Sequence, residues 1–341
     1  MKRSVLRLML AADAFAPFRY ANRRAALVLT YHRFGASDLG TFTKARAFEE
    51  QLRYLKEHYR LVPLAEIAER VARGGELPER LAAITVDDGY RDAYEVAFPL
   101  LRKYEVPATV FVVTDFLDRR MWVWTDKLRH IATQTSARAL DARIGGASLK
   151  AVLADRASRL RAARLANDAL KRLPDEAKDG EIARLAASLG VELPTEPPPE
   201  FAPFTWDEAR EMDAGGFAVE SHTVTHPVLT NTTDEQLRRE LVDSRARLED
   251  ELRRPAALFC YPNGDADARV RREVARAGYR AAVTTRPGLN DARSDPFALR
   301  RVHTEDDLAH FAQSTSGFEQ FKTRLRGGSG RAANETAAEM S

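Results

Sequence analysis

Short apolar runs rich in β-branched residues alternate along the chain with longer amphipathic stretches. The short runs predict buried strands at residues 26–31, 82–86, 108–113, 217–220, 256–261 and 280–284. Helical spacing of apolar positions predicts helices at residues 48–59, 64–73, 92–103, 206–214 and 267–277. Strands that alternate with helices in this way predict a parallel sheet with helical crossovers, either doubly wound or closed into a barrel.

The clearest helix pattern starts at Thr232. Thr232 and Glu235 match a capping box, in which two side chains bond free backbone N–H groups at the start of a helix. The apolar face of this helix consists of Leu237, Leu241, Leu248 and Leu252. The spacing therefore predicts a helix with one buried side.

One stretch interrupts the alternation. Residues 118–193 show no strand pattern and are rich in Ala, Arg and Leu, so a helical insertion is expected here. The residues that recur at helical spacing are Leu149, Leu153, Ala157 and Leu160. The connector Leu193-Pro-Thr-Glu-Pro-Pro-Pro199 follows, and it is expected to be extended in the polyproline II form.

The pattern divides the chain into five segments. They are a peripheral N-terminal segment (1–25), the first part of the barrel or sheet (26–117), the insertion with its connector (118–200), the second part (201–326) and a tail (327–341). The tail begins Gly327-Gly-Ser-Gly330 and is expected to be disordered.

Composition narrows the class of protein. Of the 341 residues, 44% are hydrophobic and 30% charged, as in an ordinary soluble enzyme. A net charge of +3, from 53 basic and 50 acidic side chains, gives no reason to expect a nucleic-acid partner. The single cysteine, Cys260, rules out an internal disulfide and fits a reducing compartment.

The N-terminus resembles a signal peptide only superficially. Lys2 and Arg3 precede a short apolar run at 5–12, but Arg7 interrupts that run. We therefore interpret the stretch as a peripheral helix and expect a cytoplasmic location, with a periplasmic or exported one as the alternative. No run reaches the roughly eighteen apolar residues of a membrane-spanning helix, so none is expected.

Reactive side chains gather where the predicted strands end. They are His32 after the first strand, Asp87 and Asp88 after the second, His222 and His226 after the fourth, and Tyr261-Pro262-Asn263-Gly264 at the end of the fifth. In β/α barrels the C-terminal ends of the strands form the mouth of the active site. This convergence predicts an active site and favours the barrel.

Two of these groups have the composition of a metal site. Two adjacent carboxylates at the end of a buried strand are unfavourable without partners, although Asp-Asp-Gly alone usually forms a solvated turn. His222 and His226 would share one side of a helix or comparable turn and could bind one ion. Pro227 disfavours a helix that continues through His226. The alternative is a pair of surface or capping histidines.

Two imidazoles and one carboxylate leave coordination positions open for water and substrate. Zinc suits such a set best for hydrolysis, because a zinc-bound water ionises near neutral pH. Iron, cobalt or nickel would fit the same ligands. We therefore expect a divalent metal cofactor, with zinc as the first choice.

Three motifs resemble the polysaccharide deacetylases of carbohydrate esterase family four. Thr85-Val-Asp-Asp-Gly89 resembles the first motif, usually Thr-Phe-Asp-Asp-Gly, and Ser221-His-Thr-Val-Thr-His226 resembles the second, His-Ser/Thr-x-x-His. Phe259-Cys-Tyr-Pro-Asn-Gly264 is similar to the third motif of poly-N-acetylglucosamine and exopolysaccharide deacetylases. The resemblance runs from about residue 27 to 303. It implies a distorted (β/α) barrel and a metal-dependent enzyme that removes N-acetyl groups from an amino-sugar polysaccharide or glycan.

The resemblance also implies roles for individual residues. Asp87 would be the general base, and Asp88, His222 and His226 would be the metal ligands. The metal and the backbone N–H of Tyr261 would stabilise the oxyanion, with Pro262 beside them at the substrate.

The general acid has two candidates. The usual family pattern places a histidine near the C-terminal end of the domain, where His303 stands in Leu299-Arg-Arg-Val-His303. In the poly-N-acetylglucosamine branch, a histidine after the first strand resembles a circularly permuted acid, and Tyr31-His32 matches it. We favour His32, with an orienting or structural role as its alternative.

Several other residues have two interpretations each. Trp122 and Trp124 could stack on sugar rings at the mouth or anchor the insertion to the barrel. Arg301 could orient Asp87, as a family arginine does, or form a surface ion pair. Cys260 is interpreted as a small core residue and not as a nucleophile.

Two competing functions stay open at this point. One is a related C–N hydrolase that acts on a small molecule or a formylated sugar-lipid. The other is a glycan-binding module without turnover. The presence of both aspartates and both histidines argues against the second, since a pure binder needs no base beside a metal.

Overall fold

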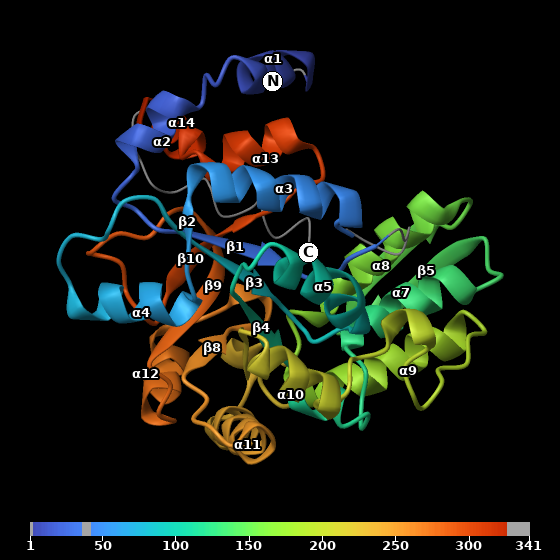
Figure 1. Cartoon of the computed structure of the whole chain (residues 1–341). Coiled ribbons are helices and arrows are strands. Elements are labelled where there is room, and N and C mark those ends of the chain that lie inside the picture. The colour runs from blue at the N-terminus through green and yellow to red at the C-terminus, as the bar shows by residue number, and fades with distance from the viewer. Residues whose placement is uncertain (1–2, 36–41, 326–341) are drawn as a thin grey trace.

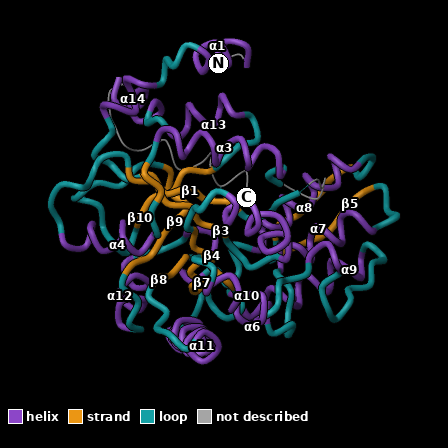
Figure 2. Tube along the Cα trace, in the orientation of Figure 1, coloured by secondary structure: helices purple, strands orange, loops and turns teal. Residues whose placement is uncertain are grey.

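The computed structural model describes residues 3–35 and 42–325, and its centre is a closed parallel barrel (Figures 1 and 2). The strands around the ring are β1 (Leu27–Tyr31), β10 (Leu299–His303), β9 (Ala281–Pro287), β8 (Leu258–Cys260), β7 (Phe217–Ser221), β4 (Ala108–Val112) and β3 (Leu81–Val86). The short β2 (Arg60–Leu61) pairs with the start of β3.

The pairing of β1 with β3 closes the ring. These two strands are in parallel register over five residue pairs, from Leu27 with Ala82 to Tyr31 with Val86. Every residue of β1, β3 and β4 is buried, as expected for parallel strands covered on both faces. The alternation of strands and helices alone left a doubly wound sheet and a barrel open, but the motif resemblance predicted a distorted (β/α) barrel, and the structure confirms the barrel.

The barrel is distorted along one side. Between β9 and β10 the register shifts at Leu299 and Arg301, and β7 and β8 share a single registered pair, Ser221 with Phe259. Next to that pair, the buried carboxylate of Glu220 accepts the backbone N–H groups of Ala257 and Leu258, both at 2.8 Å. A side chain therefore replaces part of the strand pairing.

Helices surround the strands, as Figure 2 shows in purple around orange. They are α3 (Ala45–His58), α4 (Leu64–Arg73), α5 (Phe98–Lys103), α6 (Thr114–Leu117), α10 (Trp206–Ala214), α11 (Asp234–Leu252), α12 (Ala268–Arg276), α13 (Leu308–Thr315) and α14 (Phe318–Leu325). The helix expected at 92–103 begins as a π-helix, η1 (Ala93–Ala97), before α5.

The capping box of α11 lies one residue later than expected. Its N-cap is Thr233, which pairs with Gln236. The hydroxyl of Thr232 instead donates to the carbonyl of Leu229 and belongs to the preceding turn, η4 (Leu229–Asn231). The predicted Thr232–Glu235 box is therefore wrong, although Leu237, Leu241 and Leu248 of the predicted apolar face are buried as expected and Leu252 is half-buried.

The insertion is not purely helical. It contains α7 (Trp124–Gln134), α8 (Arg156–Leu170) and α9 (Lys178–Ser188), which lie beside the barrel in Figure 1, but also a hairpin of β5 (Ala139–Ile144) and β6 (Ala147–Val152). Leu149 belongs to β6, so the helical repeat assigned from Leu149 is wrong. The sequence feature that indicates this hairpin is Gly145-Gly146. Both glycines adopt positive φ in the two-residue turn, as type I′ hairpins require.

The insertion also has an apolar core of its own. Leu128, Ile131, Leu170 and Ile182 are buried in a cluster separate from those of the barrel. The connector leads from it to a 3-10 turn, η3 (Pro199–Phe201), where Phe201 returns to the barrel core.

The first described helices lie outside the barrel (Figure 1). The expected N-terminal helix is present as α1 (Arg3–Ala11), which contacts α13, and a second helix, α2 (Ala16–Ala21), leads to β1 (Figure 1). The predicted tail at 327–341 lies outside the described residues. Within the described ranges, no helix combines the length and the apolar character needed to span a bilayer.

We expect Glu220→Ala to destabilise the barrel. Two buried N–H groups would lose their acceptor, which lowers the unfolding free energy by about 3 kcal/mol. Urea unfolding measures this loss. Glu69→Ala is the control, because Glu69 forms only an exposed pair with Arg73 and its loss should change stability by less than about 0.5 kcal/mol. Equal effects of the two substitutions would show that the Glu220 contacts do not stabilise the fold.

Candidate metal centre and active site

The predicted reactive residues meet at the C-terminal ends of the strands. His32 Nε2 lies 3.6 Å from Asp87 Oδ2. His222 Nε2 and His226 Nε2 lie 3.4 and 3.5 Å from the same oxygen of Asp88. Side chains that are far apart in sequence thus form one continuous cluster.

Asp88, His222 and His226 have the geometry of a metal-binding set. One ligand atom from each lies within 4.8 Å of the others, and all three residues are buried. Asp88 has a φ of 77°, in the left-handed region, and its carboxylate meets the imidazoles of His222 and His226, whereas that of Asp87 meets Arg301. Burial raises the pKa of Asp88, but the hydrogen bond with His222 and the charges of the imidazoles lower it well below its usual range. An ionised carboxylate and two imidazoles are the donors that a divalent metal prefers.

A tight turn, and not a helix, brings the two histidines together. Thr223 and His226 both adopt positive φ. The carboxylate of Glu240 on α11 accepts the N–H groups of Val224 and Thr225 at 2.8 and 2.9 Å, and the Thr225 hydroxyl at 2.7 Å. Glu240 was not predicted as a site residue. Its signal was a carboxylate on the buried face of a helix, between Leu237 and Leu241.

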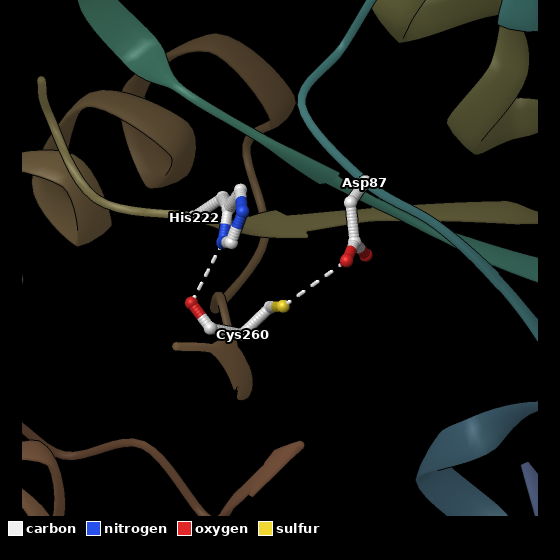
Figure 3. A group of neighbouring side chains, drawn as sticks. All are labelled: Asp87, His222 and Cys260. Carbon is white, nitrogen blue, oxygen red and sulfur yellow. Dashed lines mark hydrogen bonds between the residues drawn. The ribbon is translucent and has the colours of Figure 1, made fainter. Parts of the chain in front are cut away.

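His222 is oriented by a backbone carbonyl. Its Nδ1 lies 2.7 Å from the carbonyl oxygen of Cys260 (Figure 3). Because a carbonyl can only accept, Nδ1 carries the proton and Nε2 is left free to face Asp88. This is the arrangement of a metal-ligating histidine.

Asp87, His222 and Cys260 form a second close group, also shown in Figure 3. The thiol of Cys260 lies 3.6 Å from Asp87 Oδ2. However, Asp87 is already paired with a cation, and His222 Nδ1 is bound to a carbonyl. Asp88, His222 and His226 are therefore the better metal set, and Cys260 is the buried core residue that the sequence predicted.

Asp87 is held by Arg301 in a two-pronged ion pair. Both contacts measure 2.7 Å, and both residues are almost completely buried. Arg301 also donates to the carbonyl of Thr284 at 2.9 Å and to the hydroxyl of Thr85 at 3.0 Å. Burial raises the pKa of Asp87, but the charge and hydrogen bond of Arg301 together with the charges of His32 and His222 outweigh this and lower it to about 2. The alternative of a surface ion pair is wrong, because Arg301 is 0% exposed.

The two candidate acids have different environments: His32 lies beside Asp87, whereas His303, at the end of β10, is near enough for the charges of His32, Arg301 and Asp87 to influence it. The side chain of His32 is 33% exposed. His303 Nε2 is buried and has no hydrogen-bond partner among the described residues. Burial, together with the charges of His32 and Arg301, lowers the pKa of His303 to about 4. His303 is therefore neutral at neutral pH.

The expected role of Tyr261 does not fit the structure. Its backbone N–H donates to the carbonyl of Val283 at 3.2 Å, because strand pairing with β9 continues past the end of β8. Its hydroxyl donates to the carbonyl of Phe297. The Tyr261 amide is thus not free to bind an oxyanion here. Pro262 begins the turn η5 (Pro262–Gly264) and is buried.

The two tryptophans are buried, with exposures of 2% for Trp122 and 5% for Trp124. Neither ring is available to stack on a sugar, so the structure favours the anchoring interpretation. Trp122 packs against Phe201 of the barrel core, and the indole N–H of Trp124 donates to the carbonyl of His226 at 3.3 Å.

A family model described as polysaccharide deacetylase matches residues 74–282. The chain belongs to the polysaccharide deacetylase family. The Bacillus subtilis protein YxkH is 20% identical over 283 residues, which are 83% of this chain and 72% of that protein. A poly-beta-1,6-N-acetyl-D-glucosamine N-deacetylase of Staphylococcus epidermidis is 29% identical over 111 residues, 28% of this chain but only 38% of that protein.

Two solved structures have the same fold as this chain. The Streptococcus pyogenes deacetylase PplD superposes with a TM-score of 0.57 at 19% identity, over 86% of this chain and 99% of that one. IcaB from Ammonifex degensii gives a TM-score of 0.54 at 21% identity, over 85% and 97% of the two chains. At these identities the likeness establishes the distorted β/α barrel.

We expect Glu240→Ala to weaken metal binding. Without the carboxylate the His222–His226 turn loses three hydrogen bonds, and loss of such supporting contacts typically raises a metal Kd about 10- to 100-fold. Zinc titration against a chromophoric chelator measures the Kd. Glu235→Ala, at an exposed position of the same helix, is the control and should leave it unchanged. An unaltered Kd for Glu240→Ala would contradict the supporting role.

Proposed function

We propose that the protein is a metal-dependent hydrolase that removes N-acetyl groups from an amino-sugar polysaccharide or glycan intermediate and releases acetate. The observation that carries this proposal is the pairing of two neighbouring carboxylates with different partners. Asp88 faces two imidazoles, whereas Asp87 faces a buried guanidinium. One carboxylate is thereby suited to bind a metal and the other to accept a proton.

The residues present fit a divalent metal. Asp88, His222 and His226 would hold it, and zinc is the ion that this donor set suits best. When bound, such an ion supplies Lewis-acid chemistry that acidifies water and polarises an amide carbonyl. That contribution matters here, because a carboxylate with the low pKa of Asp87 is a weak base towards ordinary water.

Asp87 would take the proton of the attacking water. Arg301 fixes both of its oxygens and keeps it ionised, so the carboxylate is ready to accept at neutral pH. His32 would then protonate the departing amine, because it lies beside Asp87 and is partly open to solvent at the mouth. The low pKa of His303 makes it unsuitable as a proton donor near neutral pH.

The substrate class is inferred from relatives and chemistry together. The staphylococcal relatives are named for poly-β-1,6-N-acetyl-D-glucosamine. Their match covers at most 28% of this chain. We extend their activity to this chain as a proposal and take β-1,6-linked N-acetylglucosamine oligomers as the first substrate to test.

Asp87→Asn should keep the metal and lose most acetate release. The amide occupies the same space but cannot accept a proton, and loss of a general base lowers turnover about 100- to 10,000-fold. Acetate is measured after incubation with a β-1,6-linked N-acetylglucosamine pentamer, alongside the metal content of the protein. Wild-type protein that binds zinc but releases no acetate would contradict the proposed function. Near-wild-type turnover by the metal-loaded variant would exclude Asp87 as the base.

His32→Ala should lower deacetylation strongly and leave the metal content unchanged, whereas His303→Ala should have a small effect on turnover. An unactivated amine must be protonated to leave, but an activated aryl alcohol need not be. The ratio of acetamide to aryl-acetate turnover should therefore collapse in His32→Ala only. Collapse in His303→Ala instead would assign the acid to the end of β10.

A further inference from the structure

The first turn of insertion helix α7 contacts His226 directly and also contacts Tyr90, close in sequence to Asp88. The indole N–H of Trp124 donates to the carbonyl of His226 at 3.3 Å. Two residues further on, the carboxylate of Asp126 accepts the hydroxyl of Tyr90, which stands two positions after Asp88. One turn of helix thus contacts the backbone of His226 and the side chain of Tyr90, which follows Asp88 by two positions.

His226 depends on this support more than His222 does. The ring of His222 is oriented by the carbonyl of Cys260, but His226 Nδ1 is buried and has no partner among the described residues. The position of His226 is therefore set through its backbone. Its N–H donates to the hydroxyl of Thr223 at 2.9 Å, and its carbonyl accepts the N–H of Trp124. With a φ of 60°, this backbone is in a region that a bulky residue adopts only when its surroundings enforce it.

Trp124 is itself fixed from the far side. Its ring is 5% exposed, and the ammonium of Lys178 lies 5.1 Å from the ring centroid. Lys178 is buried at the start of α9 and pairs with Asp175 at 2.9 Å. A cation over an indole face is attracted to it, so α9, the third helix of the insertion, helps to hold Trp124 in place.

Asp126 fixes the other side of the metal set. It is fully buried and also accepts Arg129 Nη1 at 2.7 Å, so its charge is compensated. The ring of Tyr90 lies under the guanidinium of Arg33, 4.0 Å from the centroid. Tyr90 is therefore held on its face and at its hydroxyl, and the preceding Asp88-Gly89 turn is held with it.

We propose that the insertion is a working part of the metal centre, in which the first turn of α7 sets the position of His226 relative to Asp88. Trp124 and Asp126 are positioning residues in this arrangement, and they touch neither substrate nor metal. The inference rests on the proposed metal-dependent function, and it gives the insertion a role beyond anchoring.

The chain offers a closely matched control. Trp206 also donates its indole N–H to an oxygen, Asp118 Oδ1 at 2.7 Å, and also carries a cation, Arg247, 4.9 Å from its ring centroid. Its contacts do not reach the metal set. Trp124→Phe and Trp206→Phe therefore remove the same chemical group from two similar settings, of which one adjoins His226.

The test compares zinc Kd, the absorption spectrum of the cobalt-substituted protein and Tm for the two variants. Trp124→Phe should raise the Kd about tenfold and shift the cobalt spectrum, as loss of a contact behind a metal ligand does. Trp206→Phe should change neither. A Trp124→Phe protein that loses Tm but keeps the wild-type Kd and spectrum would overturn the proposal and leave Trp124 as an anchor. Wild-type protein that binds no zinc would overturn the proposed function itself.

Tyr90→Phe supplies an independent second variant. It removes only the hydroxyl that bonds Asp126, and the same rise in Kd is expected. If both contacts act through one turn of α7, the zinc Kd of the Trp124→Phe/Tyr90→Phe double variant should differ from the value expected by multiplying the two single effects on Kd. Coupled residues are not additive in free energy. Independent, multiplicative effects would overturn the idea that α7 is the common support.

Discussion

The buried ion pair between Asp87 and Arg301 organises the mouth of the barrel. Two opposite charges that are 1% and 0% exposed are tolerable only when their remaining polar atoms are also satisfied. Arg301 meets this condition by reaching from β10 to the carbonyl of Thr284 on β9 and to the hydroxyl of Thr85 on β3. The pair therefore links strands from both halves of the sequence, and removal of either partner would leave an uncompensated charge in the core.

The other reactive groups lie around this pair, and each has different partners. Asp88, which has a positive φ, meets two imidazoles instead of Arg301. Each histidine is then supported from a different element, His222 by the carbonyl of Cys260 on β8 and the turn before His226 by Glu240 on α11. The proposed metal set is thus in contact with groups from the barrel, a crossover helix and the insertion at the same time.

Much of this arrangement was predictable from the sequence, because fully buried parallel strands give continuous apolar runs and the reactive residues follow them directly. Closure of the ring was predicted only through the placement of reactive residues and the motif resemblance, because the β1–β3 pairing joins residues more than about 50 positions apart and leaves no local pattern. The β5–β6 hairpin was missed although Gly145-Gly146 marked its turn. The engagement of the Tyr261 amide and the support from Glu240 and Asp126 depend on which groups face each other across elements, and such pairings appear only in three dimensions.

A closed ring of strands has no first or last member. β1 and β10, from opposite ends of the described chain, are neighbours in it, and Thr30 stands in register with His303. The strand ends that carry His32 and His303 consequently open onto the same corner of the mouth, although 270 positions separate these residues in the sequence. A histidine on the strand end of either β1 or β10 can therefore face the same part of the mouth. A general-acid role can thus move between these two strands without a change in the rest of the fold.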